Sequence, residues 1–253
     1  MAIQTNGNRS AMSQVLKINR DRKEKHKSDN YIVWLNEQAE NNPSIERLYE
    51  IALVGAYFHL SFTDINRLAL YYSNPTDKYM NALNLHTEED KTHYKQYLQD
   101  FKLLGYDKKM KASDVLAFMW SDNNLASRDL SFTLYELGKK FQHPGVRFAM
   151  IESIEEQGNV LFTAYANLTK KININSQDYS FFGEKHLLLE QGHLVNQDVN
   201  EHDLFDTIAL TPDEISDAIY VIHATWDAFE VWQAGIMTTL SNFDKILSQS
   251  ITV

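Results

Sequence analysis

Apolar residues recur at every third or fourth position along most of this chain, which is the spacing of one face of an α-helix. The pattern is clearest over residues 45–72, 146–168 and 212–247. Only 9 glycines and 4 prolines interrupt the 253 residues, which favours long helices over short strands joined by turns. The sequence therefore predicts an all-α protein.

Local signals mark the expected ends of these helices. Asp77, or Thr76 before it, can cap a helix that runs to about Leu104, and Gly105 is a natural C-terminal cap. Thr211 is followed by a proline and two acids, a typical helix start. Helices are expected over residues 29–40, 45–72, 77–104, 113–141 with an interruption at 121–124, 146–168, 178–195 and 212–247.

The N-terminal segment differs from the rest of the chain. Residues 1–28 show no periodic apolar pattern, and the first 30 residues carry seven Lys or Arg against three Asp or Glu. Such a segment buries little apolar surface, so we expect a flexible basic tail over residues 1–28. No linker interrupts the remainder, and residues 29–253 are predicted to form a single helical domain.

Charge and composition exclude several classes of function. The formal net charge of −10 disfavours nucleic acid as a partner. No apolar run reaches membrane-spanning length and residues 1–28 lack the apolar region of a signal peptide, so we expect a cytoplasmic protein without a membrane partner. The chain has no cysteine, which excludes disulfide bonds and thiolate catalysis.

The segment FFGEKHLLLEQGH, residues 181–193, holds the strongest candidate chemistry. It places His186, Glu190 and His193 at positions i, i+4 and i+7, which lie on one face of a helix. Leucines between them indicate that this helix is half buried, and buried imidazoles and acids need partners. Two imidazoles and a carboxylate on one stripe suit a transition metal.

A second cluster repeats this spacing. The segment HTEEDKTH begins at His86 and ends at His93, and Glu89 and Asp90 lie between the two histidines. A single cluster of this kind is often a solvated acidic face. Two in one helical chain predict a metal held between two helices.

A third helix can supply a further carboxylate from the segment AMIESIEEQG. Glu152 is expected to point inward with Phe148, and Glu156 lies one turn later on the same face. Glu155 is expected to face solvent. Mixed histidine and carboxylate ligation suits non-haem iron or manganese better than structural zinc.

These three segments together resemble the haem-oxygenase-like di-metal oxidases. The helix with histidine, acid and histidine, preceded by Phe181-Phe182, is similar to the last metal-binding helix of that family. The segment HTEEDKTHYKQYLQDFKLLG resembles its first metal-binding helix, and FAMIESIEEQ resembles the middle helix that donates one glutamate, for which Glu152 matches best. The resemblance covers about residues 45–240, and the order of the segments agrees.

The resemblance implies a seven-helix bundle that binds two iron ions, or a manganese and an iron ion. It also implies that dioxygen is a co-substrate and that a small organic molecule, such as an amino acid or a fatty acid, is oxidised or cleaved. The implied metal ligands are His86, Glu89, Asp90, His93, Glu152, His186, Glu190 and His193.

Within this set, His93 with Glu89 or Asp90 would hold one metal, and His186 with Glu190 the other. His193 and Glu152 would complete or bridge the pair.

The sequence departs from the family pattern at two positions. In the last metal-binding helix, Glu190 stands where aspartate is commoner. In the first, His86 stands where some members carry a glutamate ligand, which leaves the acid ligand of that helix open. In other members the acid lies three residues before the histidine, which here is Asp90. His86, Glu89 and Asp90 therefore all stay candidates.

The sequence leaves two alternative functions. The first is a metal-free enzyme of the same fold, a hydrolase or a cofactor-free oxidase. The absence of cysteine opposes a thiaminase-type hydrolase. The clustered acids oppose a cofactor-free oxidase, because without a metal they would repel each other. The second is a non-enzymatic helical protein that binds metal or a partner. The substrate, the metal pair and a possible homodimer stay open.

Overall fold

The computed structural model describes residues 10–105, 111–172, 178–193 and 201–243, without the side chains of 189–193 and 201. All the regular structure in these residues is helical, which confirms the predicted all-α class. The helices are α1 (Ala11–His26), α2 (Asn30–Asn41), α3 (Ile45–Asp64), α4 (Lys78–Asp90), α5 (His93–Leu103), α6 (Ala112–Trp120), α7 (Leu125–Lys140), α8 (Pro144–Lys171), α9 (Glu184–His193), α10 (Glu201–Phe205) and α11 (Pro212–Ser241). A π-helical segment (Ile65–Leu70) extends α3, and a 3₁₀ turn (Asp122–Asn124) separates α6 from α7.

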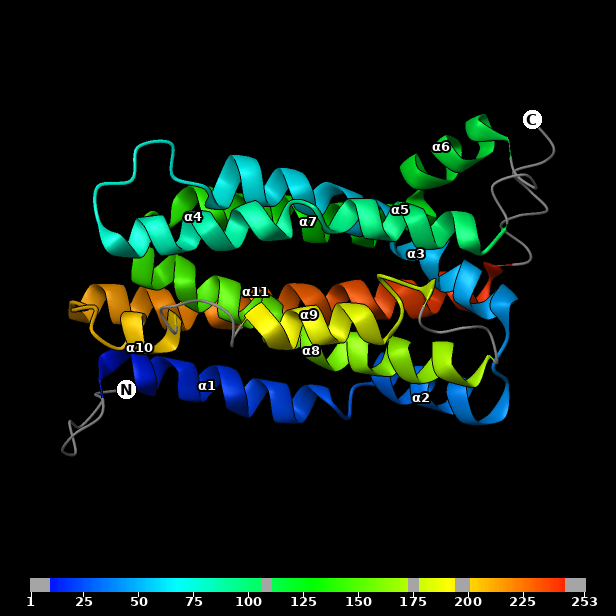
Figure 1. The fold of residues 1–253 in the computed structure, drawn as a ribbon, viewed down its shortest axis with the longest axis horizontal. Helices are drawn as coiled ribbons and strands as arrows, with labels where there is room; N and C mark the ends of the chain where they lie inside the picture. The colour runs from blue at the N-terminus through cyan, green and yellow to red at the C-terminus, as the bar shows by residue number, and fades with distance from the viewer. Residues whose placement is uncertain (1–9, 106–110, 173–177, 194–200, 244–253) are drawn as a thin grey trace.

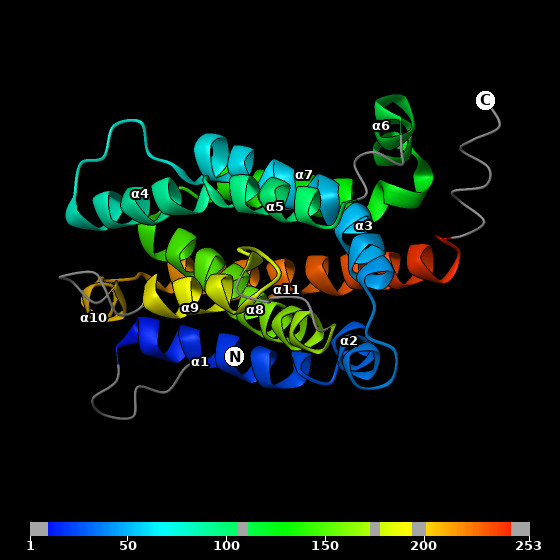
Figure 2. The same ribbon diagram turned by 45° about the vertical axis from the view of Figure 1, so that its right-hand side comes forward.

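The helices lie in three layers (Figures 1 and 2). Helices α1 and α2 form one outer layer, α8, α9, α10 and α11 the middle layer, and α3, α4, α5 and α7 the other outer layer. Helix α8 contacts α11, α1, α2 and α4, so its side chains meet both outer layers. The aromatic core includes Phe148 of α8 and Trp226 and Trp232 of α11, all fully buried. Among the described residues, no helix combines the length and apolar character needed to cross a membrane.

The predicted caps form as expected. The Asp77 side chain accepts a hydrogen bond from the Met80 backbone N–H at the start of α4. Gly105 follows α5 with a φ of 71°, a left-handed conformation that favours glycine. At α11, Thr211 and Glu214 form a reciprocal capping box. These local signals fix where the helices begin and end.

The helix expected over residues 77–104 is divided into α4 and α5. The Thr63 hydroxyl of α3 donates a hydrogen bond to the Lys91 carbonyl at 2.8 Å, and the Thr92 hydroxyl donates to the Glu89 carbonyl at 2.9 Å. These bonds satisfy carbonyl groups of the last turn of α4, so the chain turns at Lys91 and Thr92. His93 thereby becomes the first residue of α5.

The prediction of a flexible tail is wrong for the described part of residues 1–28. Ser10 caps α1, and Met12, Val15 and Leu16 are buried in the main core. Helix α1 packs against α8 and α11. Its buried face continues with polar residues, Asn19 and His26, which are satisfied by hydrogen bonds to those helices. Met12, Val15 and Leu16 stand at i, i+3 and i+4, but the apolar pattern ends after one turn because polar Asn19 and His26 continue the buried face.

Candidate metal centre

Two histidine–carboxylate groups lie between α4, α8 and α10. In the first, His86 and Asp90 are one turn apart on α4, and Glu155 reaches them from α8. The His86 Nε2 atom lies 3.2 Å from Asp90 Oδ2 and 3.4 Å from Glu155 Oε1. One ligand atom from each residue falls within 4.8 Å of the others. His86 and Asp90 are buried, and Glu155 is partly buried.

The second group joins Glu152 of α8 to His202 of α10. The His202 Nε2 atom lies 3.2 Å from Glu152 Oε2. Burial raises the pKa of the Glu152 carboxyl, while His202 opposes this and the charge of Glu155 adds to it. The charge of His86 also acts on Glu152, so the two groups form one electrostatic unit.

Two further histidines, His93 of α5 and His186 of α9, pack ring against ring with centroids 4.7 Å apart. The His186 Nδ1 atom lies 3.0 Å from Gln96 Oε1. Since a carboxamide oxygen only accepts, His186 donates from Nδ1, and its lone pair is on Nε2. Gln96, one turn after His93 on α5, therefore sets the tautomer and ring orientation of His186.

The position of α9 is held by Asp100, a buried residue of α5. Its carboxylate accepts hydrogen bonds from the backbone N–H groups of Ser180, Phe181 and Phe182 at 2.7 to 2.8 Å. These residues lead into α9. The α5 side chains thus fix both the approach to α9 and the ring of His186.

A small, mostly aromatic cavity of about 50 Å³ adjoins these groups. His59 of α3 lines it, and burial together with the charge of His186 lowers the pKa of His59 to about 3. His59 is therefore neutral at physiological pH. The other lining residues are Phe58, Phe62, His93, Ile154, Glu155, Gln157, Gly158, Leu161, Phe162, Phe181 and Phe229.

The acidic candidates on α8 and α4 differ in the neighbours that their side chains meet. Glu152 points inward, as expected from its place near Phe148. The expectation that Glu155 faces solvent is wrong, because α4 packs against that side of α8 and brings His86 to its carboxylate. Glu156 instead forms an ion pair with Lys23 of α1. On α4, the side chain of Glu89 is exposed, so the structure brings Asp90 and not Glu89 beside His86.

Two predicted ligands lie outside the described side chains, namely Glu190 and His193. The backbone of α9 is helical through both positions, as the sequence predicts. Sequence reasoning missed His202 and His59. Asp206 follows His202 at i+4, a spacing that could have marked His202 as a candidate. His59 has no acid or second histidine three or four residues away, so only the packing of helices brings it to the site.

The donor set fits a transition metal. Metal–ligand bonds of about 2.1 Å at right angles place neighbouring ligand atoms about 3 Å apart, close to the separations around His86 Nε2. Imidazole and carboxylate donors, with no thiolate in the chain, match iron or manganese. Four further side chains with potential donor atoms come from neighbouring helices, namely Glu152 of α8, His202 of α10, His93 of α5 and His186 of α9.

Comparison with known proteins identifies the fold. No protein-family model matches this chain, and no curated protein matches it. Among solved structures, the chain is similar to a domain of unknown function with a haem oxygenase-like fold from Shewanella denitrificans. The TM-score is 0.65 at 14% identity, over 92% of this chain and 94% of that one. The protein is thus an all-helical protein of haem-oxygenase-like fold, as the sequence resemblance predicts.

Proposed function

We propose that this protein is a non-haem di-iron oxidase or oxygenase that uses dioxygen to oxidise or cleave a small organic substrate. The observation that carries the proposal is the convergence of His86, Asp90 and Glu155 from two helices onto one point. The proposal also draws on the similarity of three sequence segments to the haem-oxygenase-like di-metal oxidases.

Charge supports a bound cation at this place. Asp90, Glu152 and Glu155 bring three carboxyl groups into a largely buried region. Gathering carboxylates in a region of low dielectric is unfavourable unless positive charge balances them. A divalent metal pair supplies that charge, and the imidazoles of His86, His93, His186 and His202 supply neutral donors to the same ions.

When bound, iron supplies the electrons that dioxygen needs, which is chemistry that no side chain of this site provides. The residues of the chain perform the remaining tasks. His86, Asp90 and Glu155 hold one position, and Glu152 with His202 lies beside it. Gln96 orients His186 toward the site.

The aromatic cavity is the proposed substrate site because Glu155 belongs both to its lining and to the His86 cluster, and His93, a further proposed ligand, also lines it. Its apolar walls exclude water and favour an organic substrate. Neutral His59 adds a polar group there without a buried charge.

The test is anaerobic loading of the purified protein with ferrous iron, followed by iron analysis and exposure to oxygen. We expect about two iron ions per chain and oxygen consumption above the rate of free iron. His86→Ala and Glu155→Gln should each weaken iron binding at least about 100-fold, since even outer-shell partners cost 10- to 100-fold.

The matched control is Glu156→Gln, one residue beyond Glu155 on the same helix. Its carboxylate pairs with Lys23, so iron binding should be unchanged. Equal iron content in Glu155→Gln and Glu156→Gln would show that the cluster holds no metal. Oxygen consumption that persists in the chelated protein would instead favour a cofactor-free oxidase of this fold.

A further inference from the structure

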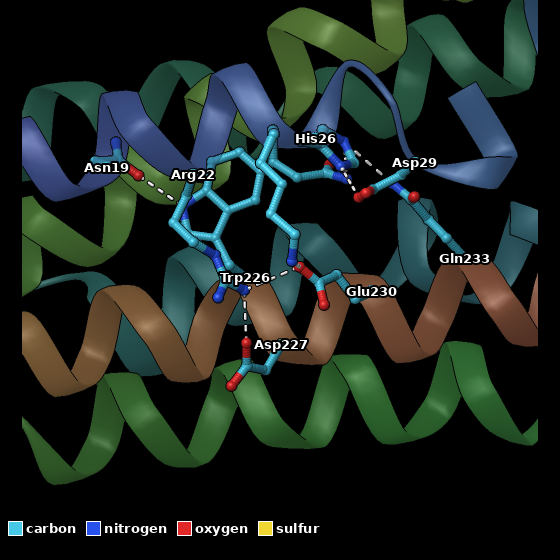
Figure 3. A network of polar contacts seen from close by, with 10 residues as sticks. Asn19, Arg22, His26, Asp29, Trp226, Asp227, Glu230 and Gln233 are labelled. Carbon is cyan, nitrogen blue, oxygen red and sulfur yellow. Dashed lines mark hydrogen bonds and ion pairs between the residues drawn. The ribbon is translucent and has the colours of Figure 1, made fainter. Parts of the chain in front are cut away.

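Another buried histidine, His26, lies at the end of α1, away from the His86 cluster on α4 (Figure 3). It contacts both α8 and α11. Its Nδ1 atom lies 2.6 Å from Asp29 Oδ2. Its Nε2 atom lies 3.0 Å from Gln157 Nε2 and 3.3 Å from Gln233 Nε2. The imidazole also packs edge-on against Trp226, with ring centroids 5.2 Å apart.

The network determines which way the Gln157 amide points. The Asp29 carboxylate accepts a hydrogen bond from Nδ1–H of His26, so Nε2 of the neutral ring carries a lone pair. Burial keeps the ring neutral, because it lowers the pKa of His26. The lone pair accepts from an N–H group, and Gln157 Nε2 lies nearer to it than Gln233 Nε2 does, so Gln157 presents its amide nitrogen to His26. The Gln157 carbonyl oxygen is then directed away from His26.

Gln157 also lines the aromatic cavity, two residues beyond Glu155 on α8. The side chain is 1% exposed, so neither of its amide atoms is bathed in bulk solvent. With one amide N–H directed at His26, the Gln157 oxygen lies at the other end of the amide, where it can act as an acceptor in the cavity. The cavity walls are mainly apolar and include five phenylalanine rings.

We propose that Gln157 is a specificity-determining residue that accepts a hydrogen bond from an N–H or O–H group on an otherwise apolar substrate. Asp29 and His26 act as positioning residues that keep the Gln157 amide in the accepting orientation. The inference rests on the proposed function only in taking this cavity as the substrate site. It narrows the substrate class to apolar molecules that carry one donor.

The test compares indole with benzofuran, which have nearly the same shape and differ in the N–H group. Dissociation constants are measured by calorimetry or ligand-observed NMR on the full chain, with iron content determined on the same samples. We expect wild-type protein to bind indole roughly three- to tenfold more tightly than benzofuran, the effect of one neutral hydrogen bond. Gln157→Met should remove this preference and leave benzofuran binding intact.

Gln233→Met is the matched control, because Gln233 also contacts His26 but does not line the cavity. It should keep the preference for indole. Retained benzofuran binding shows that a variant's cavity is folded, and the wild-type comparison needs no variant at all. Equal binding of the two compounds by wild type, no binding of either, or an unchanged preference in Gln157→Met would overturn the inference.

The iron measurement separates this inference from the proposed function. Iron binding without a preference for indole overturns the role of Gln157 alone. A preference for indole in protein that takes up no iron supports Gln157 and overturns the di-iron proposal.

Discussion

Helices α1 and α4 lie in the two outer layers, on either side of the layer that holds α8 (Figure 1). Each carries a buried histidine that contacts α8, His26 on α1 and His86 on α4, and the surroundings of the two differ in charge. His86 faces two carboxylates, Asp90 and Glu155, and its charge also acts on a third, Glu152. His26 faces one carboxylate and two carboxamides. Helix α8 contributes to both groups, since Glu155 contacts His86 and Gln157 contacts His26.

The difference teaches how to interpret a buried histidine. In the His26 network, the Asp29 carboxylate accepts a hydrogen bond from Nδ1–H, and amide N–H groups reach Nε2. Around His86, a single ring nitrogen, Nε2, lies within 3.2 to 3.4 Å of two carboxylates, those of Asp90 and Glu155. The first arrangement joins helices. The second gathers negative charge, which is what a metal site requires.

The comparison predicts that α1 and the His26 network stabilise the fold. Deletion of residues 1–28 tests this, and it is the change with the largest expected effect. Burial of Met12, Val15 and Leu16 is worth roughly 4.5–9 kcal/mol in total, at about 1.5–3 kcal/mol for each apolar side chain. That is comparable to the whole stability of a typical domain, about 5–15 kcal/mol. The deleted protein should therefore lose cooperative unfolding in thermal melts.

A milder pair of variants examines the same point. Leu16→Ala should cost about 2–5 kcal/mol, whereas Lys17→Ala, at an exposed position, should stay within about 0.5 kcal/mol of wild type. Urea denaturation measures both. A truncated protein that melts like the full chain would mean that α1 contributes nothing to the core.

The His86 side is predicted to depend on metal, and a thermal shift measures that dependence. Ferrous iron at about 100 times its dissociation constant stabilises the native state by about 2.7 kcal/mol. For a domain of this size we expect a rise in melting temperature of roughly 5–10 °C.

Two acids of α4, Asp90 and Glu88, supply the variant and its control. Asp90→Asn should lose most of the shift, since its carboxylate contacts His86. Glu88→Gln should keep it, since that side chain is exposed and pairs with Lys91. The same shift in both variants would place the metal elsewhere.

The smallest predicted effect is on the pH dependence of stability. Burial lowers the pKa of His26 below the usual value of 6.5, so the unfolded chain binds a proton before the native protein does. Stability from this residue is therefore lost as pH falls below 6.5. The contribution has a slope of at most about 1.4 kcal/mol per pH unit.

Urea midpoints measured between about pH 5 and about pH 7 test this slope. His26→Gln should flatten the acid side of the curve. His223→Gln, at an exposed histidine, should leave it unchanged. If NMR showed His26 protonated in the native protein at neutral pH, its amide contacts would have to be reassigned, and the contrast with His86 would disappear.

The sequence by itself determined the all-α class and most helix ends. Caps such as Asp77, Gly105 and Thr211 act within one turn of the chain, so their residues carry the information locally. The spacing of His86 and Asp90 likewise guarantees that both lie on one face of a helix. Local spacing was therefore enough to identify α4 and α9 as chemically unusual.

Tertiary packing decided the rest of the site. Glu155, and not Glu156, meets His86 because α4 and α1 pack on different sides of α8. His202 and His59 reach the site from α10 and α3, which lie outside the predicted metal-binding segments. Helix α1 is buried through polar side chains whose partners lie more than 100 residues away, as in the bond from Asn19 to the Glu152 carbonyl. Such contacts depend on how whole helices pack, and residue spacing within one helix does not encode them.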